Sequence, residues 1–180
     1  VTLWLGEAYL FDMKIVAIIV VNFYMLGMRQ PVLTERDALG IFWYDRYKPI
    51  FESVINLGFS IPLALKFGIA GVLLGTLIST VTTSLWVEPY VLFKYGFHKN
   101  CAVYFAKYFG YTAVTLAAGG VCYFLSNQVH ISAPVLSFAV KALICAVVPN
   151  IIFLLVYSRT SAFQAVWGII KKKIFIRKVK

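Results

Sequence analysis

Apolar runs long enough to cross a membrane are the feature that most limits what this chain can fold into. Of its 180 residues, 61% are hydrophobic and 13% are charged, whereas soluble domains carry about 25% charged residues. A soluble protein of this length exposes too much surface to bury so many apolar side chains. We therefore expect an all-α, polytopic membrane helix bundle with about five transmembrane helices.

Length separates the spanning runs from other apolar segments, because a helix needs about 20 mainly apolar residues to cross the hydrocarbon core. The transmembrane region is predicted over residues 13–157, with spans at 13–29, 49–65, 69–87, 108–125 and 134–157. Buried strands are only about 4–8 residues long, so the length of these runs favours helices. Proline discourages helix at the residue before it, and the pair Glu88-Pro89 is therefore predicted to end the third span.

The segments outside these runs are polar or basic. Residues 1–12 are predicted to form an extracytoplasmic connector, and residues 158–180 a basic cytoplasmic tail with helical character. Between the first two spans, residues 38–44 are apolar and aromatic, which suits an interfacial segment. The chain begins at Val1 with neither Met nor a charged leader, so we expect it to be the C-terminal part of a longer membrane protein.

The distribution of Lys and Arg predicts the orientation. With five spans, fourteen of the 17 Lys and Arg residues fall on one side, in two connectors and the tail. Lys14 and Lys66 fall on the other side, and Lys141 lies inside the last span. Short cytoplasmic loops carry the excess of Lys and Arg, so the C-terminus is predicted to be cytoplasmic. Attraction to anionic lipids explains the net charge of +10 more simply than nucleic-acid binding does.

Glu52 and Asn56 form the first candidate site. They stand one helical turn apart and share one face of the second span. In one interpretation, Glu52 faces a polar cavity or forms a gate with a cationic residue. In the other, it reaches the cytoplasmic interface or caps the start of its helix, where the helix dipole favours an acid. The sequence leaves both alternatives open.

Cationic side chains form the second candidate set. It consists of Arg29, Arg36, Arg46 and Lys48 in the first connector, and Lys141 in the last span. Ionisable residues as deep as Lys141 usually face the bundle interior or water, although the long lysine stem could reach the interface. If it faces inward, Lys141 is the best candidate for meeting an anionic head group.

Glycines mark a predicted packing face. Gly68, Gly71 and Gly75 fall three and four residues apart, and a run rich in Ser and Thr follows them. Small residues let membrane helices approach closely, and hydroxyls bond to nearby carbonyl groups. A substrate path lined by hydroxyls is the alternative reading of the same face.

Several kinds of chemistry are not expected from this sequence. His98 and His130 fall on opposite sides of the predicted membrane, so they do not suit one metal site. No Gly-rich phosphate loop occurs, and no nucleophile stands close to a base. We expect no cofactor and no enzymatic activity.

A resemblance to a known family rests on the order of several short motifs. They are Trp4-Leu5-Gly6-Glu7, Asn22-Phe23-Tyr24-Met25, Gly27-Met28-Arg29-Gln30-Pro31, Tyr44-Asp45-Arg46-Tyr47-Lys48-Pro49, Glu52-x-x-Ile55-Asn56, Gly68-Ile69-x-Gly71 and Trp86-x-Glu88-Pro89. Together they resemble the C-terminal half of bacterial polysaccharide repeat-unit flippases, in the multidrug, oligosaccharidyl-lipid and polysaccharide exporter superfamily. The resemblance is strongest from Trp4 to Tyr95.

The resemblance implies a function and its partners. The substrate would be a polyprenyl-pyrophosphate-linked oligosaccharide, moved across the bacterial cytoplasmic membrane by rocking of two helix bundles around a central cavity. The partners would be membrane lipids, an N-terminal helix bundle of the same protein and polysaccharide assembly proteins. Arg29, Arg36, Arg46 and Lys48 would receive the head group at the cytoplasmic mouth. The alternatives are a multidrug exporter of the same superfamily and an integral membrane enzyme of polysaccharide synthesis.

Overall fold

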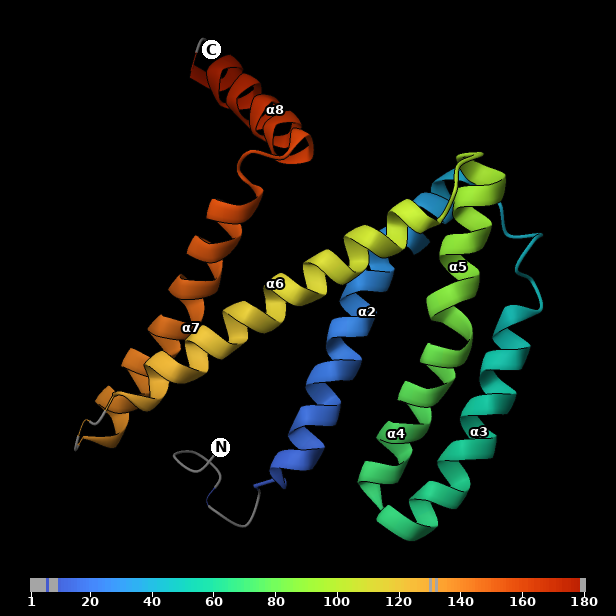
Figure 1. Ribbon diagram of the computed structural model, residues 1–180, viewed down its shortest axis with the longest axis horizontal. Coiled ribbons are helices and arrows are strands. Elements are labelled where there is room, and N and C mark those ends of the chain that lie inside the picture. The colour runs from blue at the N-terminus through green and yellow to red at the C-terminus, as the bar shows by residue number, and fades with distance from the viewer. Residues whose placement is uncertain (1–5, 7–9, 130, 132, 179–180) are drawn as a thin grey trace. The chain divides into compact units, whose positions relative to one another are not determined.

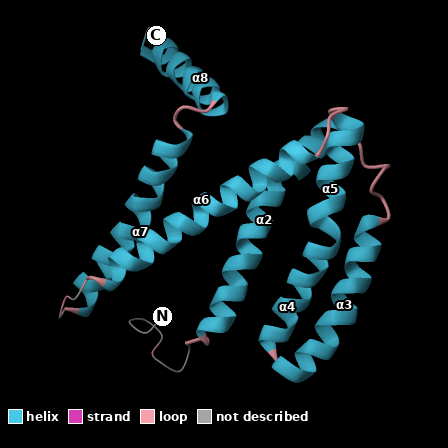
Figure 2. Cartoon of the chain, viewed as in Figure 1, coloured by secondary structure: helices cyan, strands magenta, loops and turns pink. Residues whose placement is uncertain are grey.

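The described part of the chain is helical throughout, with short turns and no strand among the described residues (Figure 1, Figure 2). The computed structural model describes residues 6, 10–129, 131 and 133–178, and side chains as far as Lys171. The chain divides into two compact units, residues 1–108 and residues 109–180, and each is described by itself. The all-α prediction is confirmed.

Each helix begins and ends as follows, with η marking π-helical segments. The elements are α2 (Met13–Leu39), α3 (Lys48–Phe67), α4 (Ile69–Ser79), η2 (Thr80–Ser84), α5 (Leu85–Val91), η3 (Leu92–Gly96), α6 (Ala102–Asn127), α7 (Pro134–Tyr157) and α8 (Ser161–Lys178). Within the described residues, five helices are long and apolar enough to cross a membrane, where α4 to η3 count as one. The chain is therefore membrane-embedded, as its composition indicates.

Helices α3 and α4 form a tight antiparallel hairpin joined by a single residue, Gly68 (Figure 1). Gly68 has φ 59°, a left-handed conformation that glycine adopts without steric cost. One turn and two turns later, Gly71 and Gly75 lie against the backbone of α3, where a methyl group would overlap Leu63 and Ser60. The predicted small-residue face is thus a packing surface, and the backbones of α3 and α4 touch along it.

The third spanning helix is longer than predicted. Expected to end at Glu88-Pro89, it continues through α5 and η3 to Gly96, with Pro89 inside it. Membrane helices tolerate proline where π-type turns and hydroxyl groups satisfy the freed backbone carbonyls. Such turns occur here on both sides of Pro89, because the π-helical segments η2 and η3 flank α5.

Helix α2 also runs beyond its predicted limit. The polar stretch after Arg29 was expected to be a connector, yet the helix continues through Pro31 to Leu39 and ends at Gly40, which has φ 66°. The charged residues of this last part need not leave the bundle, since Arg29 and Arg36 find carboxylate partners on other segments. Residues 40–47 lie outside helix, and they include residues 40–44 of the expected interfacial segment.

The remaining helices keep the predicted order. Helix α6 begins at Ala102, earlier than expected, and the boundary between the two units falls within it. Helix α7 covers Pro134–Tyr157, the predicted span. In the second unit, the rings of Tyr111 on α6 and Tyr157 on α7 meet edge to face with centroids 5.2 Å apart.

Candidate functional site

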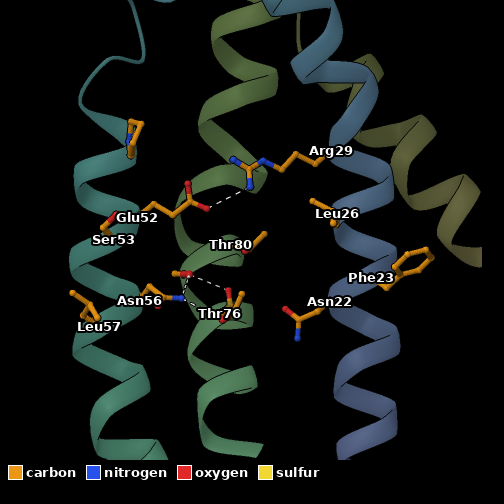
Figure 3. Close-up of a pocket in the computed structure, with 12 residues that line it drawn as sticks. Asn22, Phe23, Leu26, Arg29, Glu52, Ser53, Asn56, Leu57, Thr76 and Thr80 are labelled. Carbon is orange, nitrogen blue, oxygen red and sulfur yellow. Dashed lines mark hydrogen bonds and ion pairs between the residues drawn. The ribbon is translucent and has the colours of Figure 1, made fainter. Parts of the chain in front are cut away.

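A cavity of about 730 Å³ opens between α2, α3 and the α4–η2 segment of the first unit (Figure 3). Its polar side chains come from all three helices, although these helices are apolar enough to span a membrane. The lining residues are Asn22, Phe23, Leu26, Arg29, Pro49, Glu52, Ser53, Asn56, Leu57, Thr76, Ser79 and Thr80. Polar groups are costly in lipid, so their convergence on one cavity marks the candidate site.

Amide groups form the deeper polar part of this cavity. The Nδ2 group of Asn56 on α3 donates to Thr76 Oγ1 and Ser79 Oγ on α4, each at 3.3 Å (Figure 3). From α2, Asn22 Nδ2 donates to the carbonyl of Leu73 on α4 at 3.2 Å. These bonds tie the walls of the cavity together and leave amide and hydroxyl oxygens along its surface.

Arg29 forms the closest ion pair of the site. Its Nε and Nη2 atoms lie 2.6–2.9 Å from the carboxylate oxygens of Glu88 on α5. The Glu88 side chain is 1% exposed, whereas that of Arg29 is 23% exposed. Such a bidentate pair fixes the guanidinium plane, so one edge of Arg29 is anchored inside the bundle.

Lys48 and Glu52 complete a four-residue ion network with Arg29 and Glu88. Lys48 donates to Glu88 and, at 2.9 Å, to Glu52 one helical turn along α3. The contact between Arg29 Nη1 and Glu52 is longer, at 3.4 Å. Two cations and two carboxylates balance each other, which is what burial of charge in a membrane protein requires.

Glu52 lies where the first of its two alternatives places it. This carboxylate lines the cavity and pairs with Arg29 and Lys48, and it caps no helix end. Glu52 and Asn56 share the cavity wall, as their spacing predicts (Figure 3). Glu88 was missed as a site residue, because Glu88-Pro89 was read as the end of a span. A carboxylate flanked by apolar residues on both sides was the available signal.

Arg36 and Arg46 lie outside the lining of this cavity. Arg36 Nη1 pairs with the buried carboxylate of Asp45 at 2.6 Å, and Arg46 stacks its guanidinium 3.7 Å from the ring centroid of Trp43. Both side chains therefore stabilise the turn between α2 and α3. Their predicted role in receiving a head group stays a prediction.

Lys141 lies on α7, in the second unit, and is partly exposed. In the described part of the chain it forms no ion pair with a carboxylate. The basic residues at 172–180 and the motif residues Trp4 and Glu7 lie outside the described side chains.

Metal binding finds no support among the described residues. No group of three His, Cys, Asp or Glu side chains in that part of the chain could hold a metal ion. His130 lies outside the described residues, and His98 lies at the end of η3, away from the residues that line the cavity.

No protein-family model, no curated protein and no solved structure matches this chain. The chemistry of the site must therefore be read from its own groups. Amides and hydroxyls suit ligands rich in hydroxyl groups, and the weakly paired edge of Arg29 can bond an oxyanion.

Proposed function

We propose that this chain forms part of a membrane transporter that moves polyprenyl-pyrophosphate-linked oligosaccharides across a bacterial cytoplasmic membrane. The observation that carries the proposal is the cavity of about 730 Å³, which places amides, hydroxyls and one partly exposed guanidinium between membrane-length helices. A wall of lipid-facing helices has no structural need for such a cavity, whereas a polar cargo that crosses a membrane does.

The sugar part of such a substrate fits the amide wall. Oligosaccharides present many hydroxyl groups, and Asn22, Asn56 and Thr76 offer both donors and acceptors. Asn56 donates to the hydroxyl of Thr76 at 3.3 Å, and Asn22 donates to the backbone carbonyl of Leu73 at 3.2 Å. Exchange of those long bonds for bonds to a sugar would cost little free energy.

The pyrophosphate part of the substrate fits Arg29. Glu88 fixes two nitrogens of the guanidinium at 2.6–2.9 Å, while Nη1 has only the 3.4 Å contact with Glu52. A phosphate oxygen could replace Glu52 at Nη1, and Glu52 would keep its 2.9 Å contact with Lys48. The network thus offers a cation to an anionic ligand without leaving a buried charge unpaired.

The orientation that we propose follows from the charge distribution. Connectors at one end of the spans and the C-terminal tail carry fourteen of the 17 Lys and Arg residues, and short cytoplasmic loops carry such an excess. The Arg29–Glu88 pair lies in the C-terminal halves of α2 and of the third spanning helix, Ile69–Gly96, nearer that end. Arg29 would then meet the pyrophosphate soon after the substrate enters from the cytoplasm.

Transport can be tested in proteoliposomes that contain the complete transporter of which this chain forms part, and a fluorescent polyprenyl-pyrophosphate oligosaccharide. Dithionite, which does not cross the membrane, bleaches only the outer leaflet unless the label exchanges between leaflets. We expect the transporter to increase the bleached fraction and Asn56→Leu to abolish the increase. Asn150→Leu is the control, because Asn150 bonds only to a carbonyl of its own helix, at 2.6 Å. A bleached fraction equal to that of empty vesicles contradicts the proposal.

A multidrug exporter is the second candidate, and one observation favours it. Glu52 and the aromatic ring of Phe23 line the same cavity, and lipophilic cations bind to carboxylates and aromatic faces. Glu88 adds a second carboxylate, which is buried within the third spanning helix. Saturable binding of tetraphenylphosphonium that Glu52→Gln removes would favour this candidate.

A further inference from the structure

An aromatic groove lies on the first unit, apart from the ion network and its cavity. It encloses about 480 Å³ between the α2–α3 turn, α5, η3 and the start of α6. Its lining is apolar or aromatic: Tyr44, Trp86, Val87, Tyr90, Val91, Tyr95, Cys101 and Phe105. The rings of Tyr44 and Tyr95 stack with centroids 3.9 Å apart, and Trp86 lies 5.0 Å from Phe105.

A basic pocket of about 500 Å³ adjoins this groove, and Tyr90 and Cys101 line both. Its other lining residues are Lys94, His98, Lys99 and Asn100. His98 turns the chain with φ 52°, and the backbone N–H of Lys99 bonds to the carbonyl of Phe93 at 2.8 Å. This turn at the end of η3 brings Lys94 and Lys99 into one pocket.

The ammonium group of Lys94 is positioned by the aromatic rings. Its Nζ donates to the hydroxyl of Tyr90 at 2.6 Å, and it lies 5.0 Å and 5.3 Å from the ring centroids of Tyr90 and Tyr95. Aromatic faces attract a cation but do not neutralise it. The positive charge therefore stands at the border between the apolar groove and the basic pocket.

These lysines differ from the cations of the ion network. Arg29 and Lys48 are each paired with two carboxylates. Neither the groove nor the basic pocket has an Asp or Glu in its lining, and in the described part of the chain Lys94 and Lys99 form no ion pair with a carboxylate. Their charge is available to an external anion.

We propose that the aromatic groove and the basic pocket together bind one anionic phospholipid. Its phosphate would lie between Lys94 and Lys99, and an acyl chain would follow the groove past Tyr90 to Trp86. The two parts match the two parts of such a lipid, since one is apolar and the other carries uncompensated positive charge. Aromatic side chains are typical of the level where head groups meet acyl chains. This site is independent of the transported substrate.

Trp86 provides the probe, because it is half exposed and lines the groove. In a variant whose other tryptophans (Trp4, Trp43 and Trp167) are changed to Phe, bromine atoms on lipid acyl chains quench the remaining fluorescence at close range. The chain would be reconstituted in vesicles that contain brominated phosphatidylglycerol or brominated phosphatidylcholine at equal fractions. A lysine near the surface favours an anionic lipid by about fivefold, so we expect phosphatidylglycerol to be preferred by at least that factor.

Charge variants decide whether the preference belongs to this site. We expect K94Q/K99Q to remove the preference, so that brominated phosphatidylglycerol and brominated phosphatidylcholine quench Trp86 about equally. K94R/K99R should keep the preference. K14Q/K66Q is the matched control, because it also removes two positive charges. They lie at the start of α2 and at the end of α3, outside the groove and the basic pocket. Equal quenching by both lipids overturns the proposal, as does an equal loss of preference in K14Q/K66Q. The transport assay can fail while this preference persists, and the reverse also holds.

Discussion

Arg29 on α2 and Glu88 on α5 share a bidentate ion pair although 59 residues separate them in the sequence. The pair joins two neighbouring helices of the first unit, and Lys48 on α3 adds a third helix to the same carboxylate. Loss of one member of a buried ion network leaves an uncompensated charge, which costs more than the pair itself contributes.

Glu88→Gln should therefore destabilise the fold strongly. Arg29 and Lys48 would lose the charge that they share, and breaking a buried pair costs about 3–5 kcal/mol. Thermal unfolding of the detergent-purified chain would measure the effect. Asp37→Asn is the control, because Asp37 is an exposed partner of Arg36 and exposed pairs contribute less than about 1 kcal/mol. Equal melting of the two variants would show that the network does not stabilise the bundle.

Glu52→Gln separates the two candidate functions by the sign of its effect. Loss of this carboxylate frees Nη1 of Arg29, so a polyprenyl-pyrophosphate should bind about fivefold more tightly. A lipophilic cation should bind more weakly, because its counter-charge is gone. Equilibrium binding of both ligands would be compared with that of Glu35→Gln, which removes an exposed acid from α2. Unchanged affinity for both ligands would exclude the cavity as a binding site for either.

Gly71→Ala should destabilise the α3–α4 hairpin. A methyl group at Gly71 would overlap the carbonyl of Leu63, which is backbone and cannot rotate away, and overpacking of this kind costs about 1–3 kcal/mol. Gly58→Ala is the matched control, because a methyl group there meets no atom within 4 Å and alanine favours helix. If Gly71→Ala melts at or above the temperature of Gly58→Ala, the two helices are not in backbone contact.

Lys141→Ala should reduce transport while expression stays normal. The reason is that an ionisable side chain within a span usually serves a polar path rather than packing. The measurement is surface polysaccharide in a bacterial strain that depends on the gene, with Lys66→Ala at the end of α3 as a control. Surface polysaccharide at the wild-type level would show that Lys141 only reaches the interface.

The proposed orientation predicts which connectors face the cytoplasm. Asn100, before α6, and Gln128, after it, are both exposed, and they should lie on opposite sides of the membrane. In a chain without its three native cysteines, Asn100→Cys should react with a membrane-impermeant thiol reagent only after the cells are opened. Gln128→Cys should react in intact cells. The opposite pattern would invert the proposed topology.

The sequence predicts the helices far better than it predicts their ends. Apolar length is a property of the chain itself, and it locates all five spanning helices, with Pro134–Tyr157 reproduced at both limits. Helix ends that depend on partners are predicted poorly. Charged residues after Arg29 looked like a connector, yet the helix continues to Leu39, and Arg36 near its end pairs with Asp45 of the following turn.

Part of the candidate site was also predictable. The spacing of Glu52 and Asn56 places both on one face, and the cavity lies on that face. Glu88 was not predicted, because its role depends on Arg29, which is distant in sequence, and because Pro89 suggested a helix end. Charges that neutralise one another across a long sequence distance leave no local pattern in the sequence. The network of Arg29, Lys48, Glu52 and Glu88 is therefore seen only in the folded structure.

The backbone contact between α3 and α4 has a consequence for any change of shape. A single residue joins the two helices, and Gly71 and Gly75 bring their backbones into contact. The hairpin should therefore move as one rigid body. Bending would then concentrate at η2. There the π-helical turn and the Ser and Thr side chains interrupt the regular α-helical pattern of backbone hydrogen bonds. Spin labels at Val54 and Val72, both exposed, should keep a constant separation through a transport cycle.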